Sequence, residues 1–199
     1  MASPTIYYIR HGETGWNAEG RFQGSKDIPL NDLGREQAVA SGKILGRVLA
    51  QDGYKASALP FVSSPLGRAR QTMELARGAL DLPPAGYGID DRLREIGYGH
   101  WEGLTVPEME LNDAATFASR NVDKWSVAAP AGESYASVTL RMRDWFNSVT
   151  ADTITVAHGG TMRALMVVLG VATELEAADA RIGQGVVYVF RDGGLQKYS

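Results

Sequence analysis

The stretch IYYIRHG (6–12) places a cation and an imidazole directly after a predicted buried strand. The run 6–9 is β-branched and aromatic, and turn-forming residues bound it on both sides, which is typical of a strand. Arg10 and His11 therefore follow the carboxyl end of this strand. In open α/β sheets, that edge is where ligands bind.

The same arrangement recurs twice further along the chain. A second apolar strand is predicted at 153–157, and His158 follows it directly. A third, at 59–62, leads through two serines into a predicted helix that carries Arg68. Because parallel strands of one sheet end at the same edge, we expect His11, His158 and Arg68 to converge there. Three strand ends that agree indicate a functional site more strongly than any one of them alone.

Strands and helices alternate along the chain, which predicts an α/β fold with a mostly parallel sheet in a single domain, 1–199. The expected strands are 6–9, 59–62, 153–157 and 186–190, with a short edge partner at 195–198. The expected helices cover about 32–50, 65–79, 105–120, 134–148 and 159–169. Asn31 or Asp32 would cap the first helix, and Ser64 would cap the second, with Pro65 as its first residue.

Composition limits the classes of function. The 199-residue chain has a formal net charge of −3 and a sequence pI of about 5.6. No bulk attraction to nucleic acid or to an anionic membrane is expected, so positive charge for binding an anion must be local. The chain has no cysteine, which excludes disulfides, a thiol nucleophile and cysteine-ligated metals.

No targeting or membrane segment is expected. The segment MASPTIYYIRHG lacks the basic region followed by an apolar core that marks a secretory signal. The best apolar run, 165–171, is too short to span a membrane. We therefore expect a cytoplasmic protein.

Four motifs occur in order between residues 6 and 165: RHGET (10–14), SSPLGRARQT (63–72), LREIGYGHWEG (93–103) and VAHGGTMRAL (156–165). Together they resemble the motifs of the histidine phosphatases, the phosphoglycerate mutase-like superfamily. A further stretch, PAGESYASV (130–138), is similar to the segment before that family's late helix. The resemblance implies a three-layer α/β/α fold with a mixed sheet and a small helical insert at about 104–133.

The resemblance also implies catalysis through a phosphohistidine, with no metal or other cofactor. His11 would be the nucleophile. Arg10, Arg68 and His158 would hold the transferring phosphoryl group. Glu95 would first donate a proton and then act as the base. Four further residues would assist or face the substrate: Asn17, Gln23, Tyr98 and Gly159.

These residue types suit phosphoryl transfer on chemical grounds as well. An imidazole with a pKa near ~6.5 is substantially neutral at pH 7, so His11 can attack phosphorus without a separate base. Its other nitrogen would donate to a backbone carbonyl in the turn 12–13. Arginines offer paired donors to a phosphate. Because an alkoxide leaves slowly, a carboxylic acid such as Glu95 would protonate it.

Other interpretations of the same residues stay open. A metal site could form from the three histidines and Glu13, but no H-E-x-x-H pattern supports it. HGGT hints at a serine hydrolase, yet the chain has neither a G-x-S-x-G elbow nor a P-loop. Glu95 could simply pair with Arg92 or Arg94. A non-catalytic family member that acts as a binding module should lack a central site residue, and none is missing here.

Phosphatase and mutase activities are the alternatives within the family. A phosphoglycerate mutase must hold a second anionic group. The segment 104–129 contains Arg120 and Lys124 against four acidic residues: Glu108, Glu110, Asp113 and Asp123. We therefore expect a phosphatase for small phosphomonoesters, with no nucleic-acid or membrane partner. The sequence determines neither the substrate nor whether the protein is a homodimer.

Overall fold

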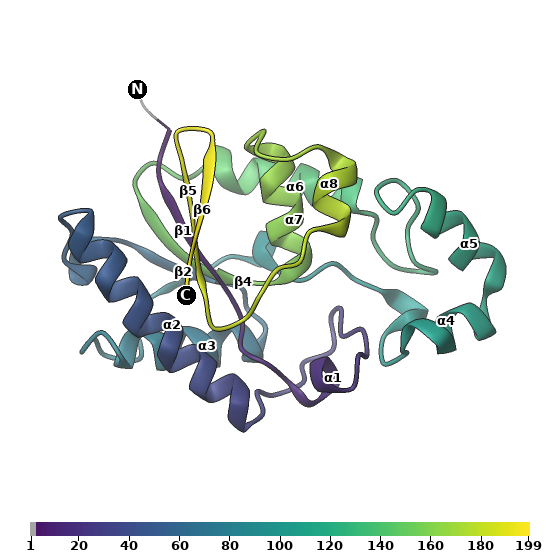
Figure 1. Cartoon of the computed structure of the whole chain (residues 1–199), viewed down its shortest axis with the longest axis horizontal. Helices are drawn as coiled ribbons and strands as arrows, with labels where there is room; N and C mark the ends of the chain where they lie inside the picture. Colours follow the sequence, from purple (N-terminus) through teal and green to yellow (C-terminus); the bar gives the residue numbers. More distant parts are fainter. Residues whose placement is uncertain (1–2) are drawn as a thin grey trace.

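A single six-stranded sheet forms the centre of the structure, a computed structural model that describes residues 3–199 (Figure 1). The strands are β1 (Ile6–Arg10), β2 (Phe61–Ser63), β3 (Gly88–Ile89), β4 (Thr153–Ala157), β5 (Val187–Arg191) and β6 (Gly194–Tyr198). Their order across the sheet is β3-β2-β4-β1-β5-β6. The first four in this order pair parallel, whereas β5 is antiparallel to β1 and β6 to β5. The expected α/β fold with a mixed sheet is confirmed.

Helices cover both faces of the sheet, which gives three layers (Figure 1). One face carries α2 (Asp32–Gln51) and α3 (Gly67–Gly78). The other carries α6 (Tyr135–Asn147) and α7 (Gly159–Val168), with the short α8 (Glu174–Asp179) beside α7. In the sheet, β4 lies between β1 and β2 and pairs parallel with both, so the three predicted strand ends lie side by side at one edge.

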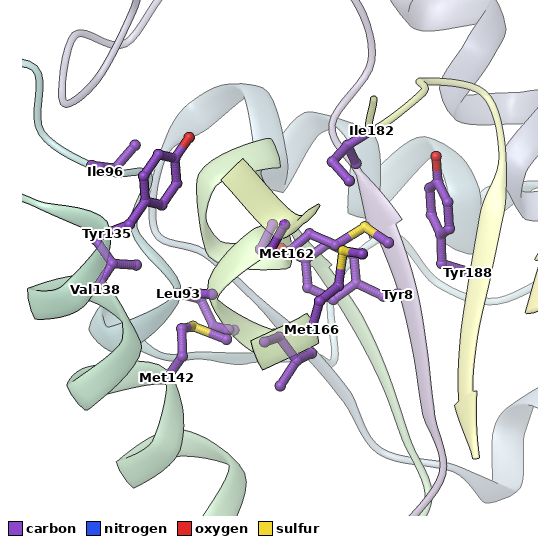
Figure 2. Packing of buried hydrophobic residues seen from close by; sticks show 14 of the residues in the cluster. Tyr8, Leu93, Ile96, Tyr135, Val138, Met142, Met162, Met166, Ile182 and Tyr188 are labelled. Atoms are coloured by element: carbon purple, nitrogen blue, oxygen red, sulfur yellow. The ribbon is translucent and has the colours of Figure 1, made fainter. Parts of the chain in front are cut away.

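Two hydrophobic cores follow from the alternation of side chains along β1. Ile6 and Tyr8 point into the core beneath α6 and α7, and Tyr7 and Ile9 point into the core beneath α2 and α3. Figure 2 shows Tyr8 among the methionines of α7. All four β1 side chains are fully buried, so packing on both faces fixes the strand end from which His11 projects.

The helix α2 follows the predicted pattern closely. The Oδ1 atom of Asn31 accepts a hydrogen bond from the Gly34 amide at 2.8 Å, so Asn31 is the cap. The buried face includes the four predicted residues Ile44, Leu45, Val48 and Leu49. The opposite face is polar. Within residues 3–199, no helix combines the length and the apolar character needed to cross a membrane.

The start of α3 differs from the predicted one. The expected cap at Ser64 with Pro65 in the first turn is wrong, because the helix begins at Gly67. The carboxylate of Asp27 accepts hydrogen bonds from the amides of Gly67 at 2.8 Å and Arg68 at 3.4 Å. An acidic group there satisfies free amides and complements the helix dipole. A residue about forty positions away thus supplies the cap and leaves Ser64 for another contact.

The helix predicted at 105–120 is two helices, α4 (Val106–Asn112) and α5 (Ala114–Val122), which lie to one side of the sheet (Figure 1). Asp113 leaves the helical conformation and caps α5 by accepting from the Thr116 amide at 3.1 Å. Several short elements escaped prediction because so few residues carry no periodic pattern. They are α1 (Gly15–Ala18), α8, β3 and three short 3₁₀ turns: Ala56–Ala58, Asp91–Leu93 and Gly99–Trp101.

Candidate active site

His11 is the first residue after β1, and the next turn orients its ring. Its Nδ1 lies 2.7 Å from the carbonyl oxygen of Gly12, so Nδ1 donates and Nε2 keeps its lone pair. The expected backbone partner in the turn 12–13 is confirmed. A Cβ on Gly12 would lie 2.1 Å from the carbonyl oxygen of Gly34. Only glycine therefore permits this close approach of the turn to α2.

The pairing of β1 with β4 brings the two histidines together. Arg10 lies opposite Ala157 in the parallel register, so the residues that follow the two strands are neighbours. The ring centroids of His11 and His158 are 5.2 Å apart. Nε2 of His158 lies 2.7 Å from the hydroxyl of Ser64, which directly follows β2. Sequence reasoning missed this role of Ser64, although its place after the third converging strand was a usable signal.

Arg10 and Arg68 each keep part of the guanidinium group unused. Arg68 is fully buried, and its two Nη atoms donate to the carbonyl oxygens of Lys26 at 2.6 Å and Gly24 at 2.9 Å. Nη1 of Arg10 donates to the carbonyl oxygen of Ile182 at 2.7 Å. The Nε atoms of both arginines are buried and have no hydrogen-bond partner in the described part of the chain.

The ring of His158 presents a third nitrogen of this kind. Its Nδ1 is also buried without a partner among residues 3–199. Buried polar atoms without partners are rare in folded proteins because each loses the hydrogen bonds it would make in water. Three such atoms on Arg10, Arg68 and His158 therefore indicate the position of a ligand that accepts hydrogen bonds. A phosphoryl group has the right charge and enough acceptor oxygens.

Burial and the neighbouring arginines keep both imidazoles neutral. Burial lowers the pKa of His11 well below its usual value of 6.5, and the charges of Arg68 and Arg10 lower it further. Burial is also the largest cause that lowers the pKa of His158, followed by the charge of Arg68. A neutral imidazole retains the lone pair that nucleophilic attack requires. The geometry thus combines a neutral imidazole with positively charged surroundings.

The lowered pKa of His11 predicts a loss of stability in acid. The unfolded chain takes up a proton at this residue below about pH 6.5, whereas the folded chain does so only at a much lower pH. The stability that the neutral His11 imidazole contributes to the folded state is complete above pH 6.5, and it is lost as the pH falls toward the pKa of His11 in the folded chain. Between pH 6.5 and that lower pKa, each unit by which the pH falls should lower the free energy of unfolding by about 1.4 kcal/mol through His11.

Urea denaturation between pH 7.5 and pH 5 would measure this effect. The buffer must be free of phosphate, because bound phosphate would favour the imidazolium form. His11→Gln should lose stability less steeply than the wild type, because glutamine takes up no proton in this range. Equal slopes for His11→Gln and the wild type would contradict the lowered pKa.

Backbone amides hold Glu95 at the same edge of the sheet. Its Oε1 accepts hydrogen bonds from the amides of Ile96 and Gly160, both at 2.9 Å. Gly160 lies in the first turn of α7, and a Cβ there would lie 2.4 Å from Oε1 of Glu95. The close approach of this carboxylate to the helix therefore requires glycine. The half-buried side chain of Glu95 also acts electrostatically on Arg10 and Arg68.

The two arginines near Glu95 in the sequence do not pair with it. Arg92 binds Asp90, and Arg94 binds Asp91. The interpretation of Glu95 as an ion-pair partner of these arginines is therefore wrong. Among residues 3–199, only Oε1 of Glu95 is engaged in hydrogen bonds, which leaves Oε2 available for proton exchange with a ligand.

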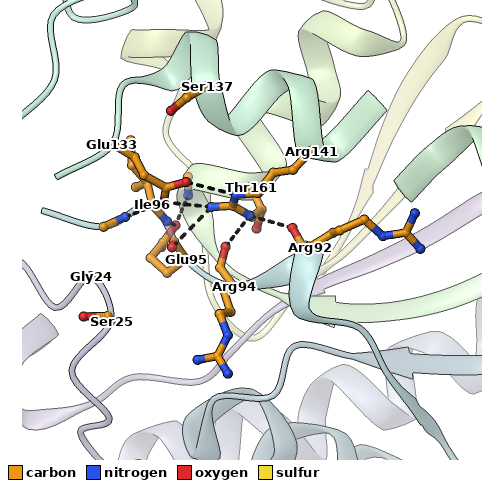
Figure 3. A network of polar contacts seen from close by, with 12 residues as sticks. Gly24, Ser25, Arg92, Arg94, Glu95, Ile96, Glu133, Ser137, Arg141 and Thr161 are labelled. Atoms are coloured by element: carbon orange, nitrogen blue, oxygen red, sulfur yellow. Dashed lines mark hydrogen bonds and ion pairs between the residues drawn. The ribbon is translucent and has the colours of Figure 1, made fainter. Parts of the chain in front are cut away.

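Arg141 of α6 fixes the loop that carries Glu95 (Figure 3). Its guanidinium donates to the carbonyl oxygens of Arg92 at 2.5 Å, Arg94 at 2.7 Å and Glu95 at 3.3 Å. The carboxylate of Glu133 lies 3.1 Å from Nη2 of Arg141 and holds it in place. One side chain thus satisfies three carbonyl groups of an irregular loop. No local pattern marks Arg141, because these partners are more than forty positions away.

Asn17 and Gln23 brace the loop that follows His11. Oδ1 of Asn17 accepts a hydrogen bond from the side chain of Gln184 at 3.1 Å. Gln23 is buried, and its Oε1 accepts from the hydroxyl of Thr14 at 3.0 Å. The carbonyl oxygens of both amides are therefore engaged within the protein, and their facing a substrate stays a prediction.

Tyr98 and Gly159 border the site on its other side. Tyr98 is buried in the wall of a cavity beside the insert. Gly159 is the first residue of α7, where helix amides have no partner within the helix. The fold thus brings together the residues expected to act on phosphorus, which are Arg10, His11, Arg68, Glu95, His158 and Gly159.

The alternative metal site is not assembled. His100 is exposed in the 3₁₀ turn Gly99–Trp101. Within the described range, no group of three or more histidine, aspartate, glutamate or cysteine side chains is arranged to hold a metal ion.

Comparison with known proteins covers nearly the whole chain. The family model of the histidine phosphatase superfamily (branch 1) matches residues 6–191. A glucosyl-3-phosphoglycerate phosphatase of Mycolicibacterium vanbaalenii is 37% identical over 178 residues, which are 82% of this chain and 73% of that protein. A 2,3-bisphosphoglycerate-dependent phosphoglycerate mutase 2 of Gloeobacter violaceus is 31% identical over 178 residues, 82% of this chain and 74% of the relative.

The solved structures agree with the sequence relatives. The native structure of a mycobacterial glucosyl-3-phosphoglycerate phosphatase matches with a TM-score of 0.77 and 28% sequence identity, over 94% of this chain and 89% of the other. The match therefore extends over nearly the whole fold. On these grounds, the chain belongs to the histidine phosphatase superfamily, branch 1.

Proposed function

We propose that this protein is a metal-independent phosphomonoesterase that hydrolyses small phosphorylated metabolites through a phosphohistidine at His11. The observation that carries the proposal is the set of three buried, unpartnered nitrogens on Arg10, Arg68 and His158 beside a neutral imidazole. Such donors supply the charge and orientation that phosphoryl transfer requires. The phosphatases among the relatives support the same activity.

In the first half-reaction, Nε2 of His11 attacks phosphorus. An N–P bond forms while the P–O bond to the departing alcohol breaks. Arg10, Arg68 and His158 stabilise the charge on the non-bridging oxygens. Glu95 in its acid form gives its proton to the departing oxygen, so the product leaves as a neutral alcohol.

In the second half-reaction, water attacks phosphorus from the side that the alcohol has left. The carboxylate of Glu95 takes a proton from this water, the N–P bond breaks, and inorganic phosphate forms. His11 returns to its neutral state with its lone pair on Nε2. No cofactor is consumed in the cycle.

The insert favours hydrolysis over a mutase reaction, in which a bisphosphate must be retained. Lys124 is paired with Asp179 at 2.6 Å, which leaves Arg120 to supply the positive charge of the insert at the cavity wall. Exposed acidic side chains such as Glu110 and Asp123 face solvent instead. This surface opposes retention of a highly charged bisphosphate.

We further propose a cytoplasmic enzyme with neither nucleic acid nor membrane as its partner.

An assay on one substrate separates these activities. With 3-phosphoglycerate and catalytic 2,3-bisphosphoglycerate, we expect release of inorganic phosphate to exceed formation of 2-phosphoglycerate. Exhaustive chelation should leave the rate unchanged, since the arginines supply the positive charge. Isomerisation that far outpaces phosphate release would establish a mutase. In the chelation test, loss of activity that only a divalent ion restores would reject the metal-independent mechanism.

A further inference from the structure

The segment 94–98, which carries Glu95, belongs to neither a helix nor a strand. Its backbone groups therefore lack the regular hydrogen bonds that hold the strand ends at His11 and His158. The amides of Ile96 and Gly160 bind the carboxylate of Glu95, but the course of the backbone beneath it depends on other contacts. Because a proton donor must lie within hydrogen-bond reach of the departing oxygen, these contacts bear on catalysis.

One ion pair, Glu133 with Arg141, holds this segment on both sides of Glu95 (Figure 3). Arg141 binds the three carbonyl oxygens of residues 92, 94 and 95. On the following side, Oε2 of Glu133 accepts a hydrogen bond from the amide of Gly97 at 2.8 Å. The amide of Glu133 also donates to the carbonyl oxygen of Gly97 at 2.8 Å. The pair thus satisfies five backbone groups of one irregular loop, with Glu95 between them.

The pair is itself held rigidly on α6. Nε and Nη2 of Arg141 donate to the two carboxylate oxygens of Glu133 at 3.2 and 3.1 Å, which is the bidentate geometry of a strong pair. Glu133 directly precedes Ser134, the cap of α6, and Arg141 lies within this helix. A Cβ on Gly132 would lie 2.5 Å from the carbonyl oxygen of Gly97. The start of α6 therefore lies directly against the segment.

The contacts of Arg141 serve this segment alone. Among residues 3–199, each hydrogen bond of its guanidinium goes either to Glu133 or to a carbonyl oxygen of residues 92–95. None goes to the strand ends that carry His11 and His158, which are fixed by the sheet. Loss of Arg141 should therefore displace the carboxylate of Glu95 and leave the phosphoryl site in place.

We propose that Arg141 and Glu133 are positioning residues for proton transfer, which hold Glu95 within reach of the departing oxygen. This inference rests on the proposed function, in which Glu95 gives its proton to that oxygen. Neither Arg141 nor Glu133 takes part in the transfer, and both act through the backbone of the segment 94–98. A displacement of about 1 Å in a reacting group can cost on the order of 10²-fold in rate, so a loosened loop should be visible in kinetics.

The test compares two substrates that differ in their need for a proton. Phosphoenzyme formation is measured in single turnovers with glycerol 3-phosphate and with nitrophenyl phosphate. We expect Arg141→Gln to slow this step about 10- to 100-fold with glycerol 3-phosphate and far less with nitrophenyl phosphate, whose leaving group departs unprotonated. The half-saturating concentrations should stay near those of the wild type, since the phosphoryl site is intact.

Two further variants separate geometry from charge. Arg141→Lys keeps the positive charge but lacks the planar fork that binds several carbonyl groups, so it should lose nearly as much as Arg141→Gln. Arg143→Gln removes an exposed arginine of the same helix and should behave as the wild type with both substrates. Full activity of Arg141→Lys would show that charge suffices, and it would contradict positioning through the fork.

A double variant tests whether Arg141 acts through Glu95. Adding Arg141→Gln to Glu95→Gln should slow the step with glycerol 3-phosphate little further, because residues that act as a unit are not additive. Glu133→Gln keeps an acceptor for the amide of Gly97 but loses the ion pair, so it should show the same selectivity between substrates with a smaller loss. This variant carries the test if Arg141→Gln does not fold.

The outcomes separate this inference from the proposed function. Equal losses for both substrates in Arg141→Gln, no loss for either, or additive losses in the double variant would overturn the positioning role and leave the phosphatase intact. If Glu95→Gln itself does not discriminate between the substrates, the role of Glu95 as acid fails, and the inference fails with it. If the wild type forms no phosphoenzyme from either substrate, the proposed function is wrong.

Discussion

Replacing His11 with alanine should reduce kcat for phosphomonoester hydrolysis by about 10⁴- to 10⁶-fold, the order found when a nucleophile is removed. The reason is that Nε2 of His11 carries the lone pair proposed to attack phosphorus, since Nδ1 is engaged with the carbonyl oxygen of Gly12. Steady-state assays with nitrophenyl phosphate would measure the loss. His100→Ala is the matched control, since it removes an imidazole that is exposed.

Direct detection of the intermediate makes this prediction sharper. Rapid quenching under non-acidic conditions, which preserve an N–P bond, followed by peptide mapping should place the phosphoryl group on His11. His158→Ala should still show some label, since His158 is proposed to stabilise the group without accepting it. A label on serine or aspartate, or normal turnover by His11→Ala, would disprove the assignment.

Replacing Glu95 with glutamine should slow phosphoenzyme formation from an alkyl phosphate by about 10²- to 10⁴-fold, the usual contribution of general acid catalysis. Glutamine keeps the size of the side chain and can still accept from the amides of Ile96 and Gly160, but it cannot deliver a proton. A nitrophenolate leaves readily without protonation. The same step with nitrophenyl phosphate should therefore suffer much less.

Single-turnover measurement is required for this comparison, because Glu95 is also proposed to activate water in the second half-reaction. Glu110→Gln removes an exposed carboxylate of the insert and should behave as the wild type with both substrates. Equal losses for the two substrates in Glu95→Gln would mean that Glu95 acts electrostatically or structurally. The proton donor would then have to be another residue near the leaving group.

Part of the site could be derived from local sequence. The strands that precede His11 and His158 are short apolar runs, and β1 and β4 lie side by side in parallel. Residues that directly follow two such strands must be neighbours, because parallel pairing in register places the carboxyl ends of the two strands side by side. The third strand brought Arg68 to the same edge for this reason. The family motifs added chemical roles that proximity alone does not provide.

Other parts depended on contacts between distant segments. The cap of α3 comes from Asp27, so the serine and proline that resemble a local cap were misleading. Glu95 lies next to two arginines in its motif, yet its carboxylate binds the amide of Gly160, sixty-five positions away. Propensity and spacing describe neighbours within a few residues, and packing then decides between competing partners for a polar group.

The sequence by itself therefore determined the α/β fold, the convergence of His11, His158, Arg10 and Arg68, and the family to which they point. Only the tertiary structure decided which of their atoms remain free, because partners such as the carbonyl oxygen of Ile182 come from unrelated loops. It also decided which charged side chains line the cavity beside the site. Counting charges within the insert could not include Arg163, since α7 brings this residue to the same cavity as Arg120 only when the two helical regions pack together.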